Sequence, residues 1–351
     1  MTKLNVGVIF GGASAEHEVS KLSAVNVLSY LNSGKYNIIP IYVSKDGTWY
    51  LYDGNFAKLP ENIEKYCATV TLGKQGILRI VGDKVRVLNV DIVFSVIHGK
   101  QGEDGTIQGL CEVMGLPYVG SGVLASSICM DKTYTNLVAS SFNIPTVPSI
   151  VLTEKYLQSL QSLDEVVKEI KSKLGYPCFI KPASSGSSIG TFKVKNKKEI
   201  ITAIDEALKI DNKIIVQKFI KCRELECAVL EEDDGLIVTP PGEIQTTDEF
   251  YSYEAKYISN ESKTIVPAKV SEEVVNTIRD YAQILFNATL CKGLARIDFF
   301  LDQTGNIIFN EINTMPGFTD ISMYPKLLNH VGYSGEVIVS KLIQNAVFKQ
   351  R

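Results

Sequence analysis

Short hydrophobic runs alternate with a helical pattern in the first part of the chain. Residues 5–12 (NVGVIFGG), 36–43 (YNIIPIYV) and 91–99 (DIVFSVIHG) are apolar runs of strand length, whereas residues 14–31 space their apolar side chains as a helix does. Strand, helix and strand in this order favour a parallel sheet. We therefore predict an α/β (α+β) fold that begins, over residues 1–127, with a doubly wound parallel sheet.

The hydrophobic pattern changes at about residue 128. Residues 131–152 predict a helix and then a strand bounded by prolines, residues 174–194 predict strands around a Ser/Gly loop, and residues 213–230 add a further strand region. The change of pattern divides the rest of the chain into two parts. We predict a central domain at 128–217 and a C-terminal domain at 218–351.

A long polar stretch interrupts the C-terminal domain. It reads PPGEIQTTDEFYSYEAKYISNESKTIVPAKV at residues 240–270. Compact domains rarely keep connecting segments of this length unless the segment has a function of its own. We predict that this stretch forms a lid loop at about residues 240–265.

Polar and apolar residues alternate in the segment 294–317 (LARIDFFLDQTGNIIFNEINTMPG), and turn residues at 302–305 separate its two halves. A period of two sends one set of side chains to the same face of a hairpin. That set is Arg296, Asp298, Glu311 and Asn313. A solvated sheet face is one interpretation. Clustered carboxylate and amide oxygens favour the other, a site for a hard divalent cation such as Mg²⁺.

Composition and charge narrow the class of protein. A chain of 351 residues with 45% hydrophobic content can bury large cores, and its length favours two or three domains. The 36 Lys and Arg residues against 39 Asp and Glu residues give no basic face for nucleic acid or a membrane surface. The sequence contains no run of about 18 apolar residues, which is the length that a membrane-spanning helix requires. Small-molecule chemistry is the better expectation.

The N-terminus and the cysteines point to the cytoplasm. Residues 1–5 lead directly into a strand without the hydrophobic region of a signal peptide. The seven cysteines are an odd number, have no CxxC spacing and lie mostly in apolar surroundings. We expect reduced packing residues rather than disulfides or a zinc site.

Two glycine-containing segments have features of anion-binding turns. Gly11 and Gly12 follow the first strand, but GGxS lacks the GxGxxG spacing of a dinucleotide site, which leaves a small anion or amine as the ligand. Residues 181–190 (KPASSGSSIG) lack the Walker A pattern, yet a flexible Ser/Gly loop can cradle phosphates with its backbone N–H groups. A plain hairpin turn is the alternative for this loop.

The order of these features resembles the ATP-grasp superfamily, in which a nucleotide lies between two α+β domains. Six motifs make the resemblance closer, to the D-alanine–D-alanine ligase family, and together they cover essentially the whole chain. They are GGASAEHEVS (11–20), HGKQGEDGTIQG (98–109), KPASSGSSIG (181–190), YEAKY (253–257), ARIDFF (295–300) and NEINTMPGFTDISMYP (310–325). The resemblance implies a three-domain architecture, with ATP between the central and C-terminal domains.

The resemblance also implies a reaction. ATP phosphorylates the carboxylate of one D-alanine, and the amine of a second D-alanine attacks the acyl phosphate to form a precursor of peptidoglycan. Asp298, Glu311 and Asn313 match ligands of two Mg²⁺ or Mn²⁺ ions, with Glu311 bridging them. Arg296 and the backbone N–H of Gly317 match the pair that stabilises the tetrahedral oxyanion.

A further group of residues matches contacts with ATP. They are Lys132, Lys181, Ser187, Ser188, Gln217, Phe219, Ile220, Glu224 and Lys256. Taken singly, Lys132, Gln217 and Glu224 are equally typical of exposed polar side chains. Gln217 departs from the usual carboxylate of the family, although its amide oxygen still accepts from the adenine amino group. Ser184 and Ser185 stand where longer side chains are common, which puts the outer contacts of the loop in doubt.

The remaining matches concern the two amino acid substrates. Glu16 matches the carboxylate that binds the ammonium of the first D-alanine, and Ser322 with the backbone of Met323 matches the clamp on the carboxylate of the second. His98 matches an imidazole near the first substrate, or is a hydrogen-bonded histidine at a strand end. Glu16, Ser187 and Tyr257 match a hydrogen-bonded trio that holds the closed lid, which excludes water from the acyl phosphate.

The sequence motifs are also compatible with other functions. D-serine or D-lactate is an alternative second substrate, although Tyr257 argues against D-lactate, and a different ATP-grasp carboxylate–amine ligase is a broader alternative. A nucleotide-binding module without turnover is the most distant, because it has no need of Arg296 and Lys256. The family resemblance implies a homodimer with small-molecule substrates.

Overall fold

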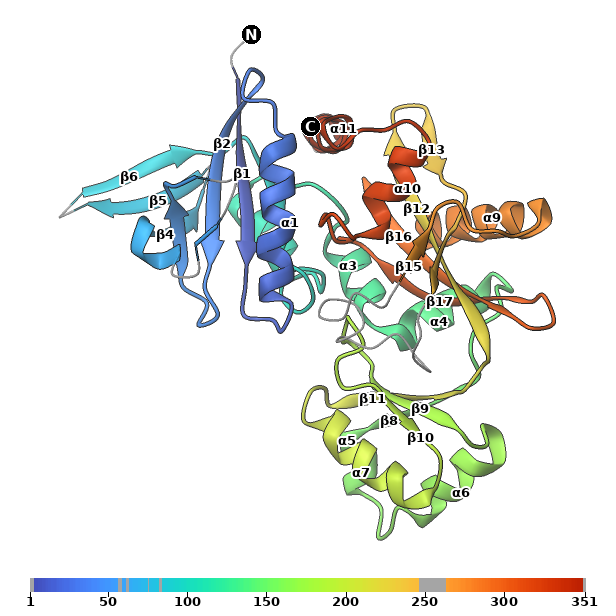
Figure 1. The fold of residues 1–351 in the computed structure, drawn as a ribbon. Helices are drawn as coiled ribbons and strands as arrows, with labels where there is room; N and C mark the ends of the chain where they lie inside the picture. The colour runs from blue at the N-terminus through green and yellow to red at the C-terminus, as the bar shows by residue number, and fades with distance from the viewer. Residues whose placement is uncertain are drawn as a thin grey trace.

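The computed structural model describes residues 3–55, 59–60, 63–74, 76–81, 84–245 and 263–349. In these residues the chain forms three sheets, each with helices packed against it (Figure 1). No helix in the described parts of the chain combines the length and the apolar composition that crossing a bilayer requires. The mixed α/β content agrees with the predicted fold class.

The first sheet is parallel only in its centre. Strand β1 (Leu4–Gly11) pairs in parallel with β2 (Tyr36–Val43) and with β7 (Ile92–Ser95), as the hydrophobic runs predict. The sheet then continues beyond β2 as an antiparallel meander, in the order β6-β5-β4-β3-β2-β1-β7. The added strands are β3 (Trp49–Tyr52), β4 (Cys67–Gly73), β5 (Gly76–Val81) and β6 (Lys84–Asn89), with the short helix η1 (Ile63–Tyr66) before β4. The sheet is therefore mixed rather than wholly parallel.

Helices cover both faces of the parallel strands, as expected for a doubly wound sheet. Val8 and Phe10 of β1 pack in one buried cluster with α1 (His17–Tyr30) and α11 (Gly335–Lys349), and α11 lies beside α1 (Figure 1). Ile9 faces the other way and packs with α2 (Thr106–Met114). Because side chains alternate along a strand, an apolar run such as β1 is buried on both faces.

The second sheet has four antiparallel strands, in the order β10-β9-β11-β8. The strands are β8 (Ser149–Thr153), β9 (Cys178–Pro182), β10 (Phe192–Val194) and β11 (Lys213–Lys218). The helices beside this sheet are α5 (Glu154–Gln158), α6 (Asp164–Lys173) and α7 (Lys197–Leu208), at the bottom of Figure 1. Its core contains residues from both sheet and helices, among them Ile170, Ile180 and Ile204.

The third sheet is antiparallel and carries the predicted hairpin at one edge. Its order is β15-β14-β12-β16-β17, with β13 paired to β12. The strands are β12 (Cys222–Glu232), β13 (Gly235–Val238), β14 (Gly242–Gln245), β15 (Lys263–Ile265), β16 (Leu294–Asp302) and β17 (Ile307–Asn313). One face packs on α9 (Glu272–Ala288), and the other packs on α10 (Met323–His330) and α11.

Helix α4 (Lys132–Ser141) does not join the core of the second sheet. It follows α3 (Val123–Met130), and both helices contact β17 of the third sheet. Ala139 of α4 belongs to the same buried cluster as Phe309 of β17. The division of the chain at 127/128 and 217/218 remains a prediction, but the core of the second sheet begins only at about Ile150.

Asp131 ties α4 to the second sheet. Asp131 is the N-cap residue of α4, and its carboxylate accepts from the backbone N–H of Thr133 (2.9 Å). The same carboxylate forms an ion pair with Lys213 on β11. Burial opposes ionisation of this carboxyl, but Lys213 and Thr133 outweigh burial and hold its pKa below the ordinary value. A partly buried charge pair thus joins a helix and a strand that belong to different cores.

We expect Asp131→Ala to lower the free energy of unfolding by about 1–3 kcal/mol, because it removes a helix cap and leaves Lys213 without its carboxylate. Asp131→Asn keeps a capping side chain, so it should lose less. A carboxyl with a lowered folded-state pKa stabilises the protein above its unfolded pKa, and that contribution fades as the pH falls through the folded value. Thermal unfolding should therefore show the wild-type advantage over Asp131→Asn shrinking below about pH 4. A constant advantage would contradict the ion pair.

Candidate active site

Two cavities adjoin between the sheets. The larger has a volume of about 480 Å³ and lies between the second and third sheets, and the smaller has about 190 Å³ and extends toward α1 and α10. Residues that line both are Lys132, Ser185, Gly186, Glu226, Ile244 and Glu311. A bound ligand that extends from one cavity into the other would contact these side chains.

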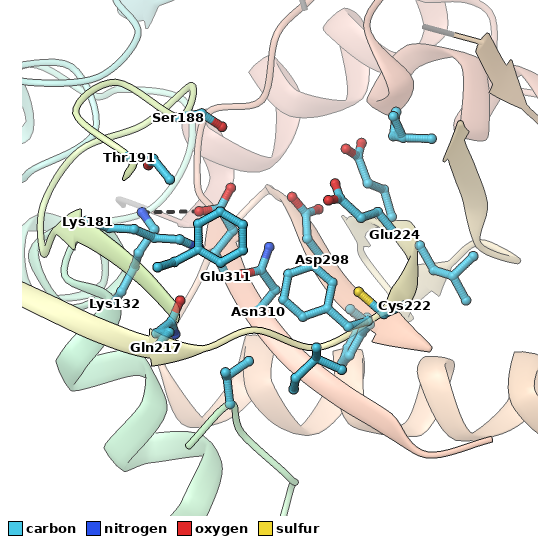
Figure 2. Close-up of a pocket in the computed structure, with 18 of the residues that line it drawn as sticks. Lys132, Lys181, Ser188, Thr191, Gln217, Cys222, Glu224, Asp298, Asn310 and Glu311 are labelled. Carbon is cyan, nitrogen blue, oxygen red and sulfur yellow. Dashed lines mark ion pairs between the residues drawn. The ribbon is translucent and has the colours of Figure 1, made fainter. Parts of the chain in front are cut away.

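The larger cavity collects most of the residues that the sequence assigned to ATP. Among the described residues these are Lys132, Lys181, Ser188, Gln217, Phe219, Ile220 and Glu224, several of which Figure 2 shows around the cavity. Gln217 comes from β11 and is only 3% exposed, so it faces the cavity rather than bulk solvent. The rings of Phe179 and Phe219 lie 6.0 Å apart at the same cavity. Flat apolar walls with few polar groups suit a nucleobase.

The Ser/Gly loop has an unusual backbone. Ser187 and Ser188 both adopt left-handed conformations, with φ of 49° and 58°, and Gly190 has φ of 70°. Residues other than glycine rarely adopt this conformation, and those that do are enriched at active sites and at loops that hold ligands. The Ser187 hydroxyl donates to Glu16, which is the predicted contact between the loop and the first sheet. The loop is therefore more than a plain hairpin turn.

The third sheet places three carboxylates in one row. Asp298 of β16 pairs with Glu311 of β17 on one side and with Glu226 of β12 on the other, so all three side chains point to the same face of the sheet. Arg296 pairs with Asn313 in the next row, as the alternating pattern predicts. A bulge after Asp298 inserts Asn310, which also lines the larger cavity.

Arg296 neutralises part of this row. Its Nε and Nη2 donate to the two oxygens of Asp298 at 2.8 and 2.7 Å, and its Nε lies 3.1 Å from Glu226 Oε2. Burial disfavours the charged guanidinium, but Asp298, Glu226 and Glu311 outweigh burial and raise the pKa of Arg296. The guanidinium is therefore charged at every working pH.

Lys132 holds the third carboxylate. Its Nζ lies 3.2 Å from Glu311 Oε2, the ion pair drawn as a dashed line in Figure 2, and it donates to the backbone oxygen of Ser185 at 2.7 Å. The side chain is 12% exposed. The interpretation of Lys132 as an exposed lysine at a helix start is therefore wrong. It joins the hairpin to the Ser/Gly loop at the junction of the cavities.

The donor atoms fit the predicted divalent ions. Asp298, Glu311 and Asn313 offer two carboxylates and one amide oxygen, which are hard ligands of the kind Mg²⁺ and Mn²⁺ prefer. Among the described residues no three His, Cys, Asp or Glu side chains come together as a metal-binding cluster. The third carboxylate of the row, Glu226, forms an ion pair with Arg296. In this structure the positive charges of Lys132 and Arg296 pair with Glu311 and Asp298, the two carboxylates that the divalent ions would neutralise.

The smaller cavity contains the residues predicted to bind the amino acids. Glu16, Gly317, Ser322 and Met323 all line it. Glu16 is 7% exposed and lies between two glycines: a side chain at Gly99 would collide with it, and a Cβ at Gly186 would lie 3.1 Å from its Oε2. A buried carboxylate facing a small cavity is suited to an ammonium group.

Ser322 is the N-cap residue of helix α10 at the other end of this cavity. A Cβ at Gly317 would lie 2.6 Å from Ser322 Oγ, so Gly317 allows the chain to approach the helix closely. The first backbone N–H groups of a helix have no partner within the helix, and Met323 is the first residue of α10. These groups favour a carboxylate ligand.

His98 lines the smaller cavity, and its ring nitrogens contact groups of the protein. Phe318 N–H donates to Ser23 Oγ (3.1 Å), which leaves the Ser23 hydroxyl hydrogen for His98 Nε2 (2.9 Å), and Nδ1–H then donates to the Met315 oxygen (3.1 Å). Both ring nitrogens are thus engaged with the protein. The alternative of a hydrogen-bonded histidine at a strand end fits this structure better than a direct polar contact with substrate.

Two predicted residues, Lys256 and Tyr257, lie outside the described residues, together with most of the predicted lid. Conversely, the side chains that line the cavities without having been predicted include Glu226 and Lys326. The only local signal for Glu226 is its spacing of two from Glu224 on one strand. For Lys326 the signal is its spacing of four from Ser322, which places both on one face of a helix.

The sheets, the two cavities and the row of acidic groups define an ATP-grasp ligase. Residues 5–121 match the family described as "D-ala D-ala ligase N-terminus", and residues 138–344 match "D-ala D-ala ligase C-terminus". The chain therefore belongs to the D-alanine–D-alanine ligase family.

Individual relatives agree with this assignment. A D-alanine--D-alanine ligase from Caldicellulosiruptor bescii is 42% identical over 100% of this chain and 97% of its own length. Among solved structures, the VanG D-Ala:D-Ser ligase from Enterococcus faecalis has a TM-score of 0.87 and 38% identity, covering 98% of this chain and 100% of that one. The D-alanine-D-alanine ligase from Coxiella burnetii has a TM-score of 0.86 and 33% identity, covering 99% and 96%.

Proposed function

We propose that this chain joins two D-alanines in an ATP-dependent, ADP-forming reaction that supplies a peptidoglycan precursor. One observation carries the proposal: Lys132, Arg296 and three carboxylates meet where a cavity with a nucleotide-type lining opens into one that contains Glu16. A phosphoryl group transferred from one cavity to a substrate in the other would pass this junction. The full-length similarity to D-alanine–D-alanine ligases supports the same conclusion.

The first step is phosphoryl transfer. A carboxylate oxygen of the first D-alanine attacks the γ-phosphorus of ATP, the bond to the β,γ-bridging oxygen breaks, and ADP leaves. Lys132 and Lys181 border the larger cavity and offer positive charge to the phosphate oxygens. Asp298, Glu311 and Asn313 would hold two Mg²⁺ or Mn²⁺ ions, which when bound neutralise charge on the phosphoryl group.

In the second step the neutral amine of the second D-alanine attacks the carbonyl carbon of the acyl phosphate. The tetrahedral intermediate then collapses as the bond from that carbon to the phosphate oxygen breaks, phosphate leaves, and the nitrogen loses a proton to give the amide. We assign the developing oxyanion to Arg296 and the Gly317 N–H, which border the smaller cavity. Glu16 binds the ammonium of the first substrate, and Ser322 with the Met323 N–H binds the carboxylate of the second. For Lys256 and Tyr257, which lie outside the described residues, we propose the roles that the motif resemblance implies, namely contact with the γ-phosphate and closure of the site.

A second candidate acceptor is D-serine. The similarity to the D-Ala:D-Ser ligase from Enterococcus faecalis, at 38% identity over nearly the whole chain, favours this alternative specifically. The two acceptors differ by one hydroxyl group. A site that is not built to bind a hydroxyl discriminates weakly against it.

The test is the mass of the product formed from ATP, Mg²⁺ and an equal mixture of D-alanine, D-serine and D-lactate. We expect D-alanyl-D-alanine as the main product, together with ADP and phosphate. A predominance of D-alanyl-D-serine would move the chain to the second candidate. ATP turnover that depends on another amino acid, or no turnover at all, would overturn the proposal.

Glu16→Gln is expected to raise KM for the first D-alanine about 10- to 100-fold, because a hydrogen bond to a charged group contributes roughly 1.5–3 kcal/mol. KM for ATP should change less than about threefold. Initial rates at varied D-alanine and fixed ATP measure both values. The matched control is Glu18→Gln, since Glu18 is 61% exposed on the same helix and pairs with Lys21. Equal KM values for the two variants would contradict the assignment of Glu16.

We further propose that the enzyme works in the cytoplasm as a homodimer. Both statements rest on the family and on the sequence pattern. Light scattering of the purified chain should give twice the mass of 38.7 kDa, and a mass of one chain would remove the dimer from the proposal.

A further inference from the structure

We propose that Glu226 is a positioning residue: it holds the Arg296 guanidinium at the substrate when Asp298 turns to a metal ion. This inference rests on the proposed function of the site. Asp298 has two roles that compete: it is a proposed metal ligand, and it also accepts hydrogen bonds from Arg296, which is assigned to the substrate. Its oxygens accept from Arg296 in this structure, yet the same oxygens are needed for a cation.

The geometry gives Arg296 a second carboxylate. Glu226 lies on β12 directly opposite Asp298, is 8% exposed and lines both cavities. Its Oε2 lies 3.1 Å from Arg296 Nε, so one guanidinium lies within reach of carboxylates from two neighbouring strands. When Asp298 releases the guanidinium, Glu226 remains as its partner.

The charges support the same division of roles. Like charges directly opposite each other in a sheet are unfavourable, and Asp298 has a carboxylate opposite it on each side. A cation is therefore needed on each side of Asp298. If the Glu226 carboxylate neutralises the charge of Arg296, the negative charges of Asp298 and Glu311 remain available to bind divalent ions.

The competing explanation is that the Glu226 ion pair only stabilises the fold. Strand β12 offers a matched comparison, because Glu232 near its end pairs with Lys341 at 2.7 Å and also accepts from Tyr333. Glu232 lines neither cavity. A purely structural role predicts that Glu226→Gln and Glu232→Gln behave alike.

The experiment compares Glu226→Gln, Glu226→Asp and Glu232→Gln in the full chain. We expect Glu226→Gln to lower kcat about 10-fold, with KM for ATP and D-alanine changed less than about threefold, and Glu226→Asp to recover part of the loss. Mn²⁺ binding in the presence of ADP, followed by electron paramagnetic resonance, should weaken severalfold in Glu226→Gln, because Arg296 then competes fully for Asp298. Glu232→Gln should match the wild type in both measurements.

A double-mutant cycle tests whether Glu226 acts through Arg296. In an Arg296→Lys background, Glu226→Gln should cost less than about twofold in kcat, since the guanidinium that it positions is gone. A full 10-fold cost in that background would overturn the inference. So would kcat and Mn²⁺ affinity within twofold of the wild type in the single Glu226→Gln variant. If the wild type makes no dipeptide, the proposed function fails, while the Mn²⁺ comparison still decides whether Glu226 controls Asp298.

Discussion

Replacing Arg296 with lysine is expected to lower kcat about 10²- to 10³-fold, the loss that follows removal of one donor to a developing oxyanion. Lysine keeps the positive charge but has no planar fork, so it cannot hold a neighbouring carboxylate and direct a second donor at the substrate at the same time. Single-turnover measurements should locate the loss in dipeptide formation. KM for ATP should change little.

The choice of lysine matters for the interpretation. Arg296→Met would remove the guanidinium that pairs with both Glu226 and Asp298, and breaking a buried ion pair in this way costs about 3–5 kcal/mol. A loss of activity in that variant could reflect unfolding. Arg296→Lys should show a melting temperature and a nucleotide affinity near those of the wild type. Retention of more than a tenth of kcat would contradict a direct role for the guanidinium.

The hairpin was predictable because its information is local. A period of two over residues 294–313 determines which side chains share a face, and the turn at Asp302 is stabilised by its own side chain, which accepts from Thr304 and Asn306. The pairing of Arg296 with Asn313 and of Asp298 with Glu311 follows directly. Only the bulge at Asn310 departs from the regular alternation.

Features that depend on long-range pairing were not predictable in the same way. Glu226 lies 72 positions from Asp298 in the chain, and only the pairing of β12 with β16 brings the two together. The packing of α4 on β17 has the same cause, since no local period sets it. His98 likewise depends on Ser23 and Met315, which come from distant segments.

The motif resemblance supplied part of what local patterns lacked. It placed Glu16 and Ser187 in one hydrogen-bonded group although they lie far apart in the sequence, and the hydrogen bond between them is present. It did not distinguish a substrate contact from a structural role for His98. That distinction required the partners of both ring nitrogens.

Glu311→Gln is expected to abolish ligation almost completely, with kcat at saturating Mg²⁺ lowered about 10²-fold or more. The amide keeps the shape of the side chain but removes the negative charge that balances Lys132 and that would lie between two divalent ions. Because the lost interaction acts on the transferred phosphoryl group, the effect should fall on kcat rather than on KM for D-alanine. Extra Mg²⁺ should not restore the rate.

The control for Glu311→Gln is Asp302→Asn in the turn of the same hairpin. It changes the charge by the same amount, and Asp302 lines neither of the two adjoining cavities. Its carboxylate accepts from Thr304 and Asn306, which lowers its pKa to about 2, so the substitution should weaken the turn slightly and leave kcat within twofold. Stopped-flow or coupled ADP assays measure both variants. If Glu311→Gln retained more than half of the wild-type activity at saturating Mg²⁺, the row of carboxylates would not be the platform on which phosphoryl transfer occurs.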